Sequence, residues 1–185
     1  MTLNRREISG RIAEGKYTLK EFEELYKIMY PVLKTYAIWL LKDADGAESV
    51  INDVFLKIWN NNIRPLEVKS YLYRSVKNAS LNYLKSRRSV YPDADENEVM
   101  EVKDLNPGPL ERMQQKELEH MVQQLIDMLP ERRRMVVRLS RTEGFSYKEI
   151  AGLLDISVRT VEDHLVKGME FLQEQVSVRE DILRY

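Results

Sequence analysis

Side chains that are suited to meet DNA base edges lie close together near the C-terminal end of the sequence. They are Arg159, Thr160, Glu162, Asp163 and Lys167. Their types indicate recognition of nucleic acid rather than the making or breaking of bonds.

Two short helices with a tight turn between them would position these side chains. Ser146 and Glu149 have the S-x-x-E spacing of a capping box, so the first helix is predicted to start at Ser146. Asp155 falls where the chain must turn, and Ser157 can cap the second helix. The spacing predicts a helix-turn-helix over residues 145–172, with one apolar side formed by Val161, Leu165 and Leu172. An ordinary helical hairpin would show similar spacing.

The helix predicted before this motif is rich in arginine and ends at Gly144. Arginines beside a recognition helix suit phosphate contacts, which give affinity and register without sequence choice, although some could simply lie on the surface. They are Arg132, Arg133, Arg134, Arg138 and Arg141. Upstream, apolar residues from Leu118 to Leu129 predict another helix that ends at Pro130.

A basic stretch lies in the first half of the chain. Between Arg64 and Arg88 there are seven basic residues and a single acid, with tyrosines interleaved. Single-stranded nucleic acid favours this mixture, because phosphates need positive charge and unstacked bases need aromatic faces. Alternatively, the tyrosines are half-buried packing residues and the cations form a solvated face.

The first ninety residues are predicted to form three helices. Apolar residues recur at helical spacing from Phe22 to Leu40, and Pro31 should kink or break that helix. After a turn over residues 43–46, a second apolar stripe runs from Val50 to Trp59, and a loop over residues 60–67 leads into the third helix. We therefore expect an all-α protein with two small helical domains joined by a flexible linker, the second being a helix-turn-helix domain.

The linker is predicted from a change in composition. Residues 93–104 hold six acidic residues and one lysine, and the sequence Asn-Pro-Gly-Pro follows at residues 106–109. Its acidity could mask basic surfaces before a partner binds. The expected division is a tail at 1–20, a helical domain at 21–88, a linker at 89–109, a helix-turn-helix domain at 110–176 and a tail at 177–185.

Composition and motifs restrict the function further. The formal net charge of −1 argues against a wholesale polyanion binder, and the absence of cysteine excludes disulfides and thiolate metal sites. No signal peptide or membrane-spanning stretch is seen, so a cytoplasmic location is the default. His120 and His164 are the only histidines, and no phosphate loop, metal-ligand cluster or nucleophile motif occurs, so we expect no enzyme, metal or cofactor.

Three segments together resemble a known family. The segment FEELYKIMYPVLKTYAIWLLKDADGAESVINDVFLKIW is followed by SYLYRSVKNASLNYLKSRR and then by LPERRRMVVRLSRTEGFSYKEIAGLLDISVRTVEDHLVKGMEFL. In this order they resemble the extracytoplasmic-function sigma factors, the small two-domain members of the bacterial sigma-70 family. The resemblance covers residues 20–88 and 110–175.

The resemblance implies a transcription initiation subunit whose partners are core RNA polymerase and promoter DNA, with an anti-sigma factor as a further possible partner. The second helix would dock on the polymerase through Asp45, Glu48, Asn52, Asp53 and Lys57. The following loop and third helix would meet the unwound promoter edge through Asn61, Asn62, Arg64, Lys69, Tyr71, Tyr73, Arg74, Lys77, Asn78, Tyr83 and Lys85. The second domain would read a distal promoter element through Arg141, Lys148, Ser157, Arg159, Thr160, Glu162, Asp163 and Lys167.

Within the distal set, Arg159 suits guanine and Glu162 suits cytosine. Residues 157–172 carry only Arg159 and Lys167 as full cations, whereas family members commonly carry more on this helix. Two other functions fit the pattern: a stand-alone DNA-binding regulator with a helical sensing domain, and a helical interaction protein that does not bind DNA.

Overall fold

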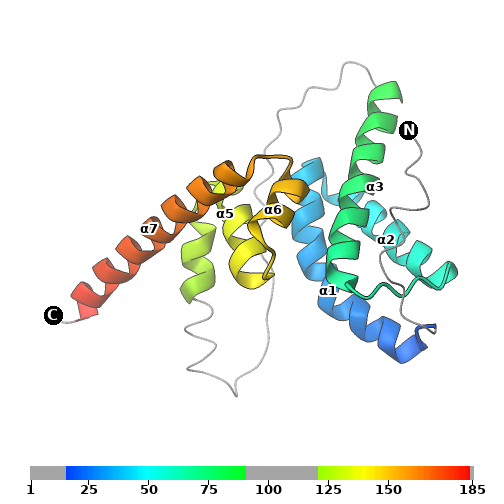
Figure 1. Ribbon diagram of the computed structural model, residues 1–185, viewed down its shortest axis with the longest axis horizontal. Helices are drawn as coiled ribbons and strands as arrows, with labels where there is room; N and C mark the ends of the chain where they lie inside the picture. The colour runs from blue at the N-terminus through cyan, green and yellow to red at the C-terminus, as the bar shows by residue number, and fades with distance from the viewer. Residues whose placement is uncertain (1–15, 91–120, 184–185) are drawn as a thin grey trace. The chain divides into compact units, whose positions relative to one another are not determined.

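The computed structural model describes residues 16–90 and 121–183. The regular elements of these residues are helices, in two compact units that divide between Lys103 and Asp104. The first unit contains α1 (Leu19–Leu41), α2 (Ala44–Asn60) and α3 (Val68–Val90). The second contains helical residues 121–127, α5 (Glu131–Val137), a π-helix η1 (Arg138–Thr142), α6 (Tyr147–Leu154) and α7 (Val158–Leu183). The predicted all-α class is confirmed (Figure 1).

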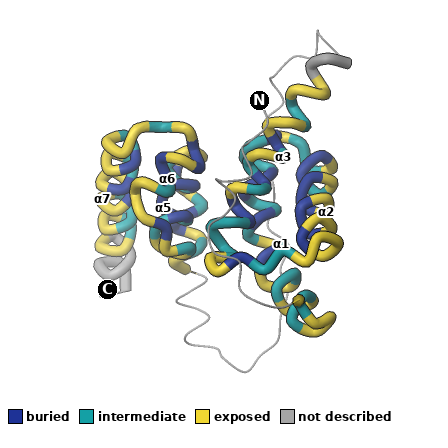
Figure 2. The backbone as a smooth tube through the Cα atoms, turned by 45° about the vertical axis from the view of Figure 1, so that its right-hand side comes forward, coloured by how far each residue is buried: buried dark blue, intermediate teal, exposed yellow. Residues whose placement is uncertain are grey.

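The three helices of the first unit pack around one apolar core. Figure 2 shows that their buried segments face one another, whereas their outer faces are exposed. The core holds Leu33 and Tyr36 of α1, Ile51 of α2 and Leu72 of α3, each at most 1% exposed. Burial of such side chains contributes roughly 1.5–3 kcal/mol each to folding.

Helix α1 starts with a capping box and runs without interruption through Pro31. Thr18 accepts a hydrogen bond from the Glu21 backbone N–H, and the Glu21 side chain accepts one from the Thr18 backbone N–H. The break expected at Pro31 is therefore wrong. Proline removes one helical hydrogen bond to the carbonyl of Lys27. Both residues are exposed, so solvent can reach this side of the helix.

The connection between α1 and α2 is shorter than expected. Lys42 ends α1 in the left-handed conformation, with φ of 54°, and Asp43 already caps α2. Residues 44–46 belong to the first turn of α2 instead of a separate turn. Asp43 accepts a hydrogen bond from the Gly46 backbone N–H at 3.0 Å, which satisfies a free donor at the helix start.

The second unit places the helix-turn-helix on a core of its own. Leu125, Val136, Leu139 and Ile150 are each at most 2% exposed there. Helix α5 packs against α7, and at Gly168 an added Cβ would lie 2.8 Å from Val137 Cγ2. A glycine at this position therefore permits the close approach of the two helices.

The turn motif forms as its sequence predicts. Ser146 and Glu149 make the capping box of α6, and Asp155 ends that helix in the left-handed conformation with φ of 56°. The Ile156 backbone N–H then donates to the carbonyl of Ala151, and Ser157 Oγ accepts from the Thr160 backbone N–H at 3.0 Å. These contacts fix the angle at which α7 leaves the turn.

Two further features differ from the sequence-based expectation. The helix that ends at Gly144 closes with five π-helical residues, in which the Glu143 backbone N–H reaches the carbonyl of Arg138. Helix α7 continues to Leu183, through most of the stretch expected to be a tail. Helix α3 includes residues 89 and 90 of the predicted linker, and the rest of that linker lies outside the described residues. No described helix combines the length and apolar character that a membrane crossing requires.

Candidate functional site

The predicted polymerase-docking face of α2 divides into two sets of side chains. Asp45, Asp53 and Lys57 are exposed. Glu48 forms an ion pair with Lys34 of α1, and Asn52 accepts a hydrogen bond from the Tyr26 hydroxyl at 3.2 Å. The hydrogen bond that Lys34 donates to Glu48 raises the pKa of Lys34, which favours its charged form. Glu48 and Asn52 therefore help to hold α1 against α2, in addition to any role in docking.

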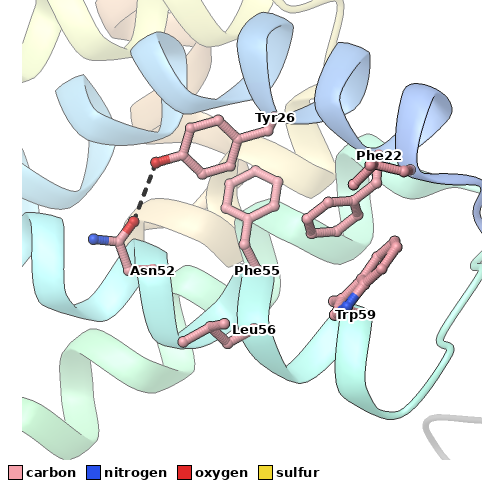
Figure 3. Close-up of a pocket in the computed structure, with 7 residues that line it drawn as sticks. Phe22, Tyr26, Asn52, Phe55, Leu56 and Trp59 are labelled. Atoms are coloured by element: carbon pink, nitrogen blue, oxygen red, sulfur yellow. Dashed lines mark hydrogen bonds between the residues drawn. The ribbon is translucent and has the colours of Figure 1, made fainter.

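An apolar groove of about 520 Å³ lies beside this face, between α1 and α2. In Figure 3, the rings of Phe22, Tyr26 and Phe55 line it, and the Tyr26 hydroxyl points to Asn52. The Phe22 and Trp59 ring centroids are 4.9 Å apart. The remaining lining residues are Leu19 and Leu56, which are 63% and 56% exposed.

The groove was not predicted from the sequence. Leu56 lies among polar residues on the outer face of α2, and Trp59 was assigned to the buried stripe although it is 38% exposed. The isolated leucine on an otherwise charged helical face is the one sequence feature that could have indicated the groove. Exposed apolar side chains gathered in a groove are typical of a docking surface.

The residues predicted to meet single-stranded DNA do not all lie on the surface. Asn61, Asn62, Arg74, Asn78 and Lys85 are exposed. Lys69, Tyr71 and Lys77 are half-buried.

Tyr73 does not fit its predicted role. It is 2% exposed, and its ring centroid lies 5.1 Å from that of Tyr36 in the core. A base cannot stack on a ring that is already covered by protein. Tyr73 is therefore a packing residue, which was the alternative interpretation of the interleaved tyrosines.

Arg64 and Tyr83 are engaged within the protein. Arg64 Nη2 lies 2.9 Å from Glu21 Oε1, and its guanidinium lies 4.9 Å from the centroid of Tyr17. The Tyr83 hydroxyl donates to Asp43 Oδ2 at 3.1 Å, and Arg87 donates to the same oxygen. Burial, together with this hydrogen bond to Asp43, raises the pKa of Tyr83.

The predicted recognition residues lie at the start of α7 and on the elements before it. Arg159, Glu162, Asp163 and Lys167 are exposed on α7, as are Arg141 on η1 and Lys148 on α6. Ser157 and Thr160 are engaged with each other, since their hydroxyl oxygens are 2.8 Å apart. The main role of the Ser157 hydroxyl is thus to cap the N-terminus of α7.

Two of the five arginines before the motif hold the second unit together. Arg134 donates through Nε and Nη2 to the carbonyl of Leu129, at 3.2 and 3.0 Å. Arg138 Nη2 lies 2.7 Å from Asp127 Oδ1. Arg132 and Arg141 are exposed and suit phosphate contacts better.

The structure offers little for catalysis among its described residues. His164 is half-buried, and desolvation lowers its pKa, so it is mainly neutral near pH 7. His120 lies outside the described residues. Within residues 16–90 and 121–183, no three His, Cys, Asp or Glu side chains are grouped so that they could hold a metal ion.

Comparison with known proteins assigns each unit to a family. Residues 25–90 match the family described as sigma-70 region 2, and residues 119–172 match the family described as sigma-70, region 4. The first match covers α2 and α3, and the second covers the helix-turn-helix. Both belong to one kind of protein, in the order that the sequence resemblance predicted.

Two individual relatives agree with this assignment. The chain is 31% identical over 143 residues to the RNA polymerase sigma-H factor of Pseudomonas aeruginosa, covering 71% of this chain and 74% of that protein. It is 30% identical over 115 residues to the ECF RNA polymerase sigma-E factor of Escherichia coli K12, covering 58% of this chain. That match spans only 60% of the sigma-E factor's own length.

The fold also has a solved counterpart. The sigma factor RpoE of Bartonella quintana, in a co-crystal structure with the anti-sigma factor NepR, superposes with a TM-score of 0.52 and 21% identity. The match covers 86% of this chain and 99% of that one. At this identity the likeness concerns the fold alone. The two family matches and the sigma factor relatives lead to one conclusion: the chain belongs to the sigma-70 family, in its extracytoplasmic-function group.

Proposed function

We propose that this protein is a sigma subunit that binds core RNA polymerase, recognises a two-element promoter and promotes strand opening for transcription initiation. It has no catalytic chemistry of its own, acts in the cytoplasm where the polymerase is, and uses no cofactor. An anti-sigma factor is a further expected partner. The observation that carries the proposal is the presence of both a region 2 unit and a region 4 unit in one chain.

Polymerase docking is assigned to α2 and the apolar groove beside it. Asp53 and Lys57 supply exposed charge, and Leu56 and Trp59 supply exposed apolar surface next to them. A protein interface commonly combines an apolar centre with a polar rim, and this arrangement provides both.

Contact with unpaired promoter DNA is assigned to α3 and the loop before it. Arg74, Asn78 and Lys85 are spaced so that they lie near one face of α3, and all three are exposed. The half-buried Tyr71 is the aromatic residue that remains for stacking, since Tyr73 is in the core. Opening the duplex costs about 1.4 kcal/mol per base-pair step, so contacts to the separated strand stabilise the open state.

Reading of the distal element is assigned to α7. In other helix-turn-helix proteins the second helix enters the major groove with its first residues towards the bases. Arg159 and Glu162 occupy those positions here and are exposed. Arg141, Lys148 and Lys167 lie on neighbouring surfaces and would contact phosphates.

Reconstitution with core RNA polymerase tests the proposal. We expect the protein to copurify with core polymerase and to direct initiation from a cognate promoter. Asp53→Lys should weaken polymerase binding, whereas Arg159→Ala should retain it and cut initiation by roughly 5- to 100-fold, the range for one base contact.

The same experiment separates the other functions. A stand-alone regulator would bind duplex DNA without polymerase, usually as a dimer, and an interaction protein would bind neither. Loss of polymerase binding in Arg159→Ala would contradict the assignment of α7 to promoter reading.

A further inference from the structure

We propose that Arg64 is a positioning residue for the loop between α2 and α3 and does not itself bind DNA. The inference rests on the proposed function, because it takes this loop to meet unpaired promoter DNA. It revises the expectation that Arg64 is one of the cations that contact the strand.

The guanidinium of Arg64 is held from several sides by the start of the first unit. Nη2 lies 2.9 Å from Glu21 Oε1, and Nη1 donates to the backbone carbonyl of Lys16 at 3.2 Å. The Tyr17 ring lies 4.9 Å from the guanidinium carbon, within the range of a cation–π contact. We call these contacts of Arg64 with Lys16, Tyr17 and Glu21 the Arg64 latch.

Glu21 links the latch to helix α1. Its Oε2 accepts hydrogen bonds from the backbone N–H and the hydroxyl of Thr18 in the capping box, while Oε1 takes Arg64. The hydrogen bonds from Thr18, with a smaller effect of Arg64, hold the pKa of Glu21 below its usual value. The carboxylate is therefore ionised at neutral pH and can serve both partners at once.

Helix α2 itself fixes only the first residues of this loop. The Ile63 backbone N–H donates to the carbonyl of Ile58, and that of Asn62 donates to Trp59, with Asn62 at φ of 50°. This is the Schellman ending of a helix, with asparagine in the left-handed position. Arg64 follows immediately, and α3 begins at Val68.

The latch thus fixes the chain between two exposed groups of side chains. Asn61 and Asn62 precede it, and Leu66 and Glu67 follow it. The contacts that fix it join residues 43 and 48 positions apart in the sequence. Release of Arg64 should therefore change where the loop presents its side chains without removing any of them.

Salt dependence distinguishes a positioning arginine from one that binds phosphate. Each phosphate neutralised on a single strand contributes about 0.7 to the slope of log affinity against log salt. An arginine whose charge is satisfied by Glu21 contributes nothing to that slope. Its loss should instead alter the discrimination between bases.

The test uses holoenzyme assembled from the full chain and core polymerase, with forked promoter DNA that varies at the unpaired positions. We expect Arg64→Gln and Glu21→Gln each to reduce base discrimination roughly fivefold or more, and the double variant to lose no more than either alone. The salt slope should stay at the wild-type value in all three. Arg74→Ala should lower the slope by about 0.7. Glu24 is an exposed carboxylate on α1, the helix that also carries Glu21. The Glu24→Gln variant should therefore match wild type in both base discrimination and salt slope.

A fall in the salt slope for Arg64→Gln, or additive losses in the double variant, would overturn the proposal. Hydrogen exchange in the free protein provides the second measurement. Arg64→Gln and Glu21→Gln should speed exchange to the same extent at the amide of Ile63, which precedes Arg64 and donates to the carbonyl of Ile58, whereas Glu24→Gln should not. Unchanged exchange overturns the latch, whereas a wild-type holoenzyme that fails to bind the fork overturns the proposed function itself.

Discussion

Asp43 joins α2 and α3 of the first unit through one carboxylate. It caps α2 by accepting from the Gly46 backbone N–H, and its Oδ2 accepts from the Tyr83 hydroxyl and from Arg87, both at 3.1 Å. A Cβ added at Gly46 would lie 2.8 Å from the Tyr83 ring, so the glycine lets α3 approach this closely. Asp43 therefore holds the C-terminal part of α3, where DNA contact is proposed, against the start of α2.

The charge of Asp43 makes the stability of the first unit depend on pH. The hydrogen bond from Gly46, with that from Tyr83 and the positive charge of Arg87 nearby, holds the pKa of Asp43 below its usual value. A carboxyl group whose pKa is lower in the folded state stabilises the fold at pH values above its unfolded pKa of about 3.9. This contribution is lost as the pH falls through the lower pKa of the folded state. We expect the free energy of unfolding to fall as the pH drops below about 5, and Asp43→Asn to flatten part of this fall.

Tryptophan fluorescence during urea unfolding at several pH values measures this effect. Trp39 and Trp59 are the only tryptophans, and both lie in the first unit, so the signal reports that unit alone. Asp53→Asn removes an exposed carboxylate from the same helix and should keep the wild-type pH profile. An equal flattening in both variants would contradict a special role for Asp43.

Long-range partners explain which residue roles could not be predicted from the sequence. Arg64 and Arg87 looked like free cations because Glu21 and Asp43, their partners, are 43 and 44 positions away. The burial of Tyr73 depends on Tyr36, which belongs to a different helix. Local spacing reports which face a residue shares with its neighbours, but it does not report which helix covers that face.

At the scale of elements, sequence patterns that span a single helical turn predicted the ends of helices correctly. The capping box of Ser146 and Glu149 and the turn at Asp155 could be predicted because each depends on residues close in sequence. The break at Pro31 was wrong, since the outcome depends on the packing of the whole helix. Met29, Leu33, Tyr36 and Ala37 bury one side of α1 on both sides of the proline. That burial offsets the hydrogen bond lost at Pro31.

Replacing Pro31 should therefore strengthen α1. Pro31→Ala restores a backbone N–H that can donate to the carbonyl of Lys27, and it removes a ring from the helix interior. Proline in a helix interior is about 3 kcal/mol less favourable than alanine. We expect a gain of roughly 1–3 kcal/mol, because proline also restricts the unfolded chain. Tryptophan fluorescence in urea measures the gain.

Glu24→Ala, at an exposed position on the same helix, is the matched control. Its effect should stay within about 0.5 kcal/mol, as for most surface substitutions. If Pro31→Ala destabilised the first unit, the proline would have to support the packing of α1 rather than oppose it.

At the scale of the whole molecule, the two units are proposed to act on different states of the promoter. In this proposal the second unit reads duplex DNA, and α3 of the first unit holds a separated strand. A template that is already unpaired at the proximal element removes the opening cost of about 1.4 kcal/mol per base-pair step. Such a template should therefore relieve defects in strand capture but leave defects in duplex reading unchanged.

Two variants of the full chain in holoenzyme test this division of labour. On duplex promoter, we expect the combined change Arg74→Ala and Lys85→Ala, and separately Arg159→Ala, each to reduce initiation by roughly 5- to 100-fold. On the pre-opened template, the first defect should shrink to within about twofold of wild type, because opening no longer limits initiation. The Arg159→Ala defect should persist, since the distal element is still double-stranded. Rescue of both variants, or of Arg159→Ala alone, would mean that the units do not divide the work in this way.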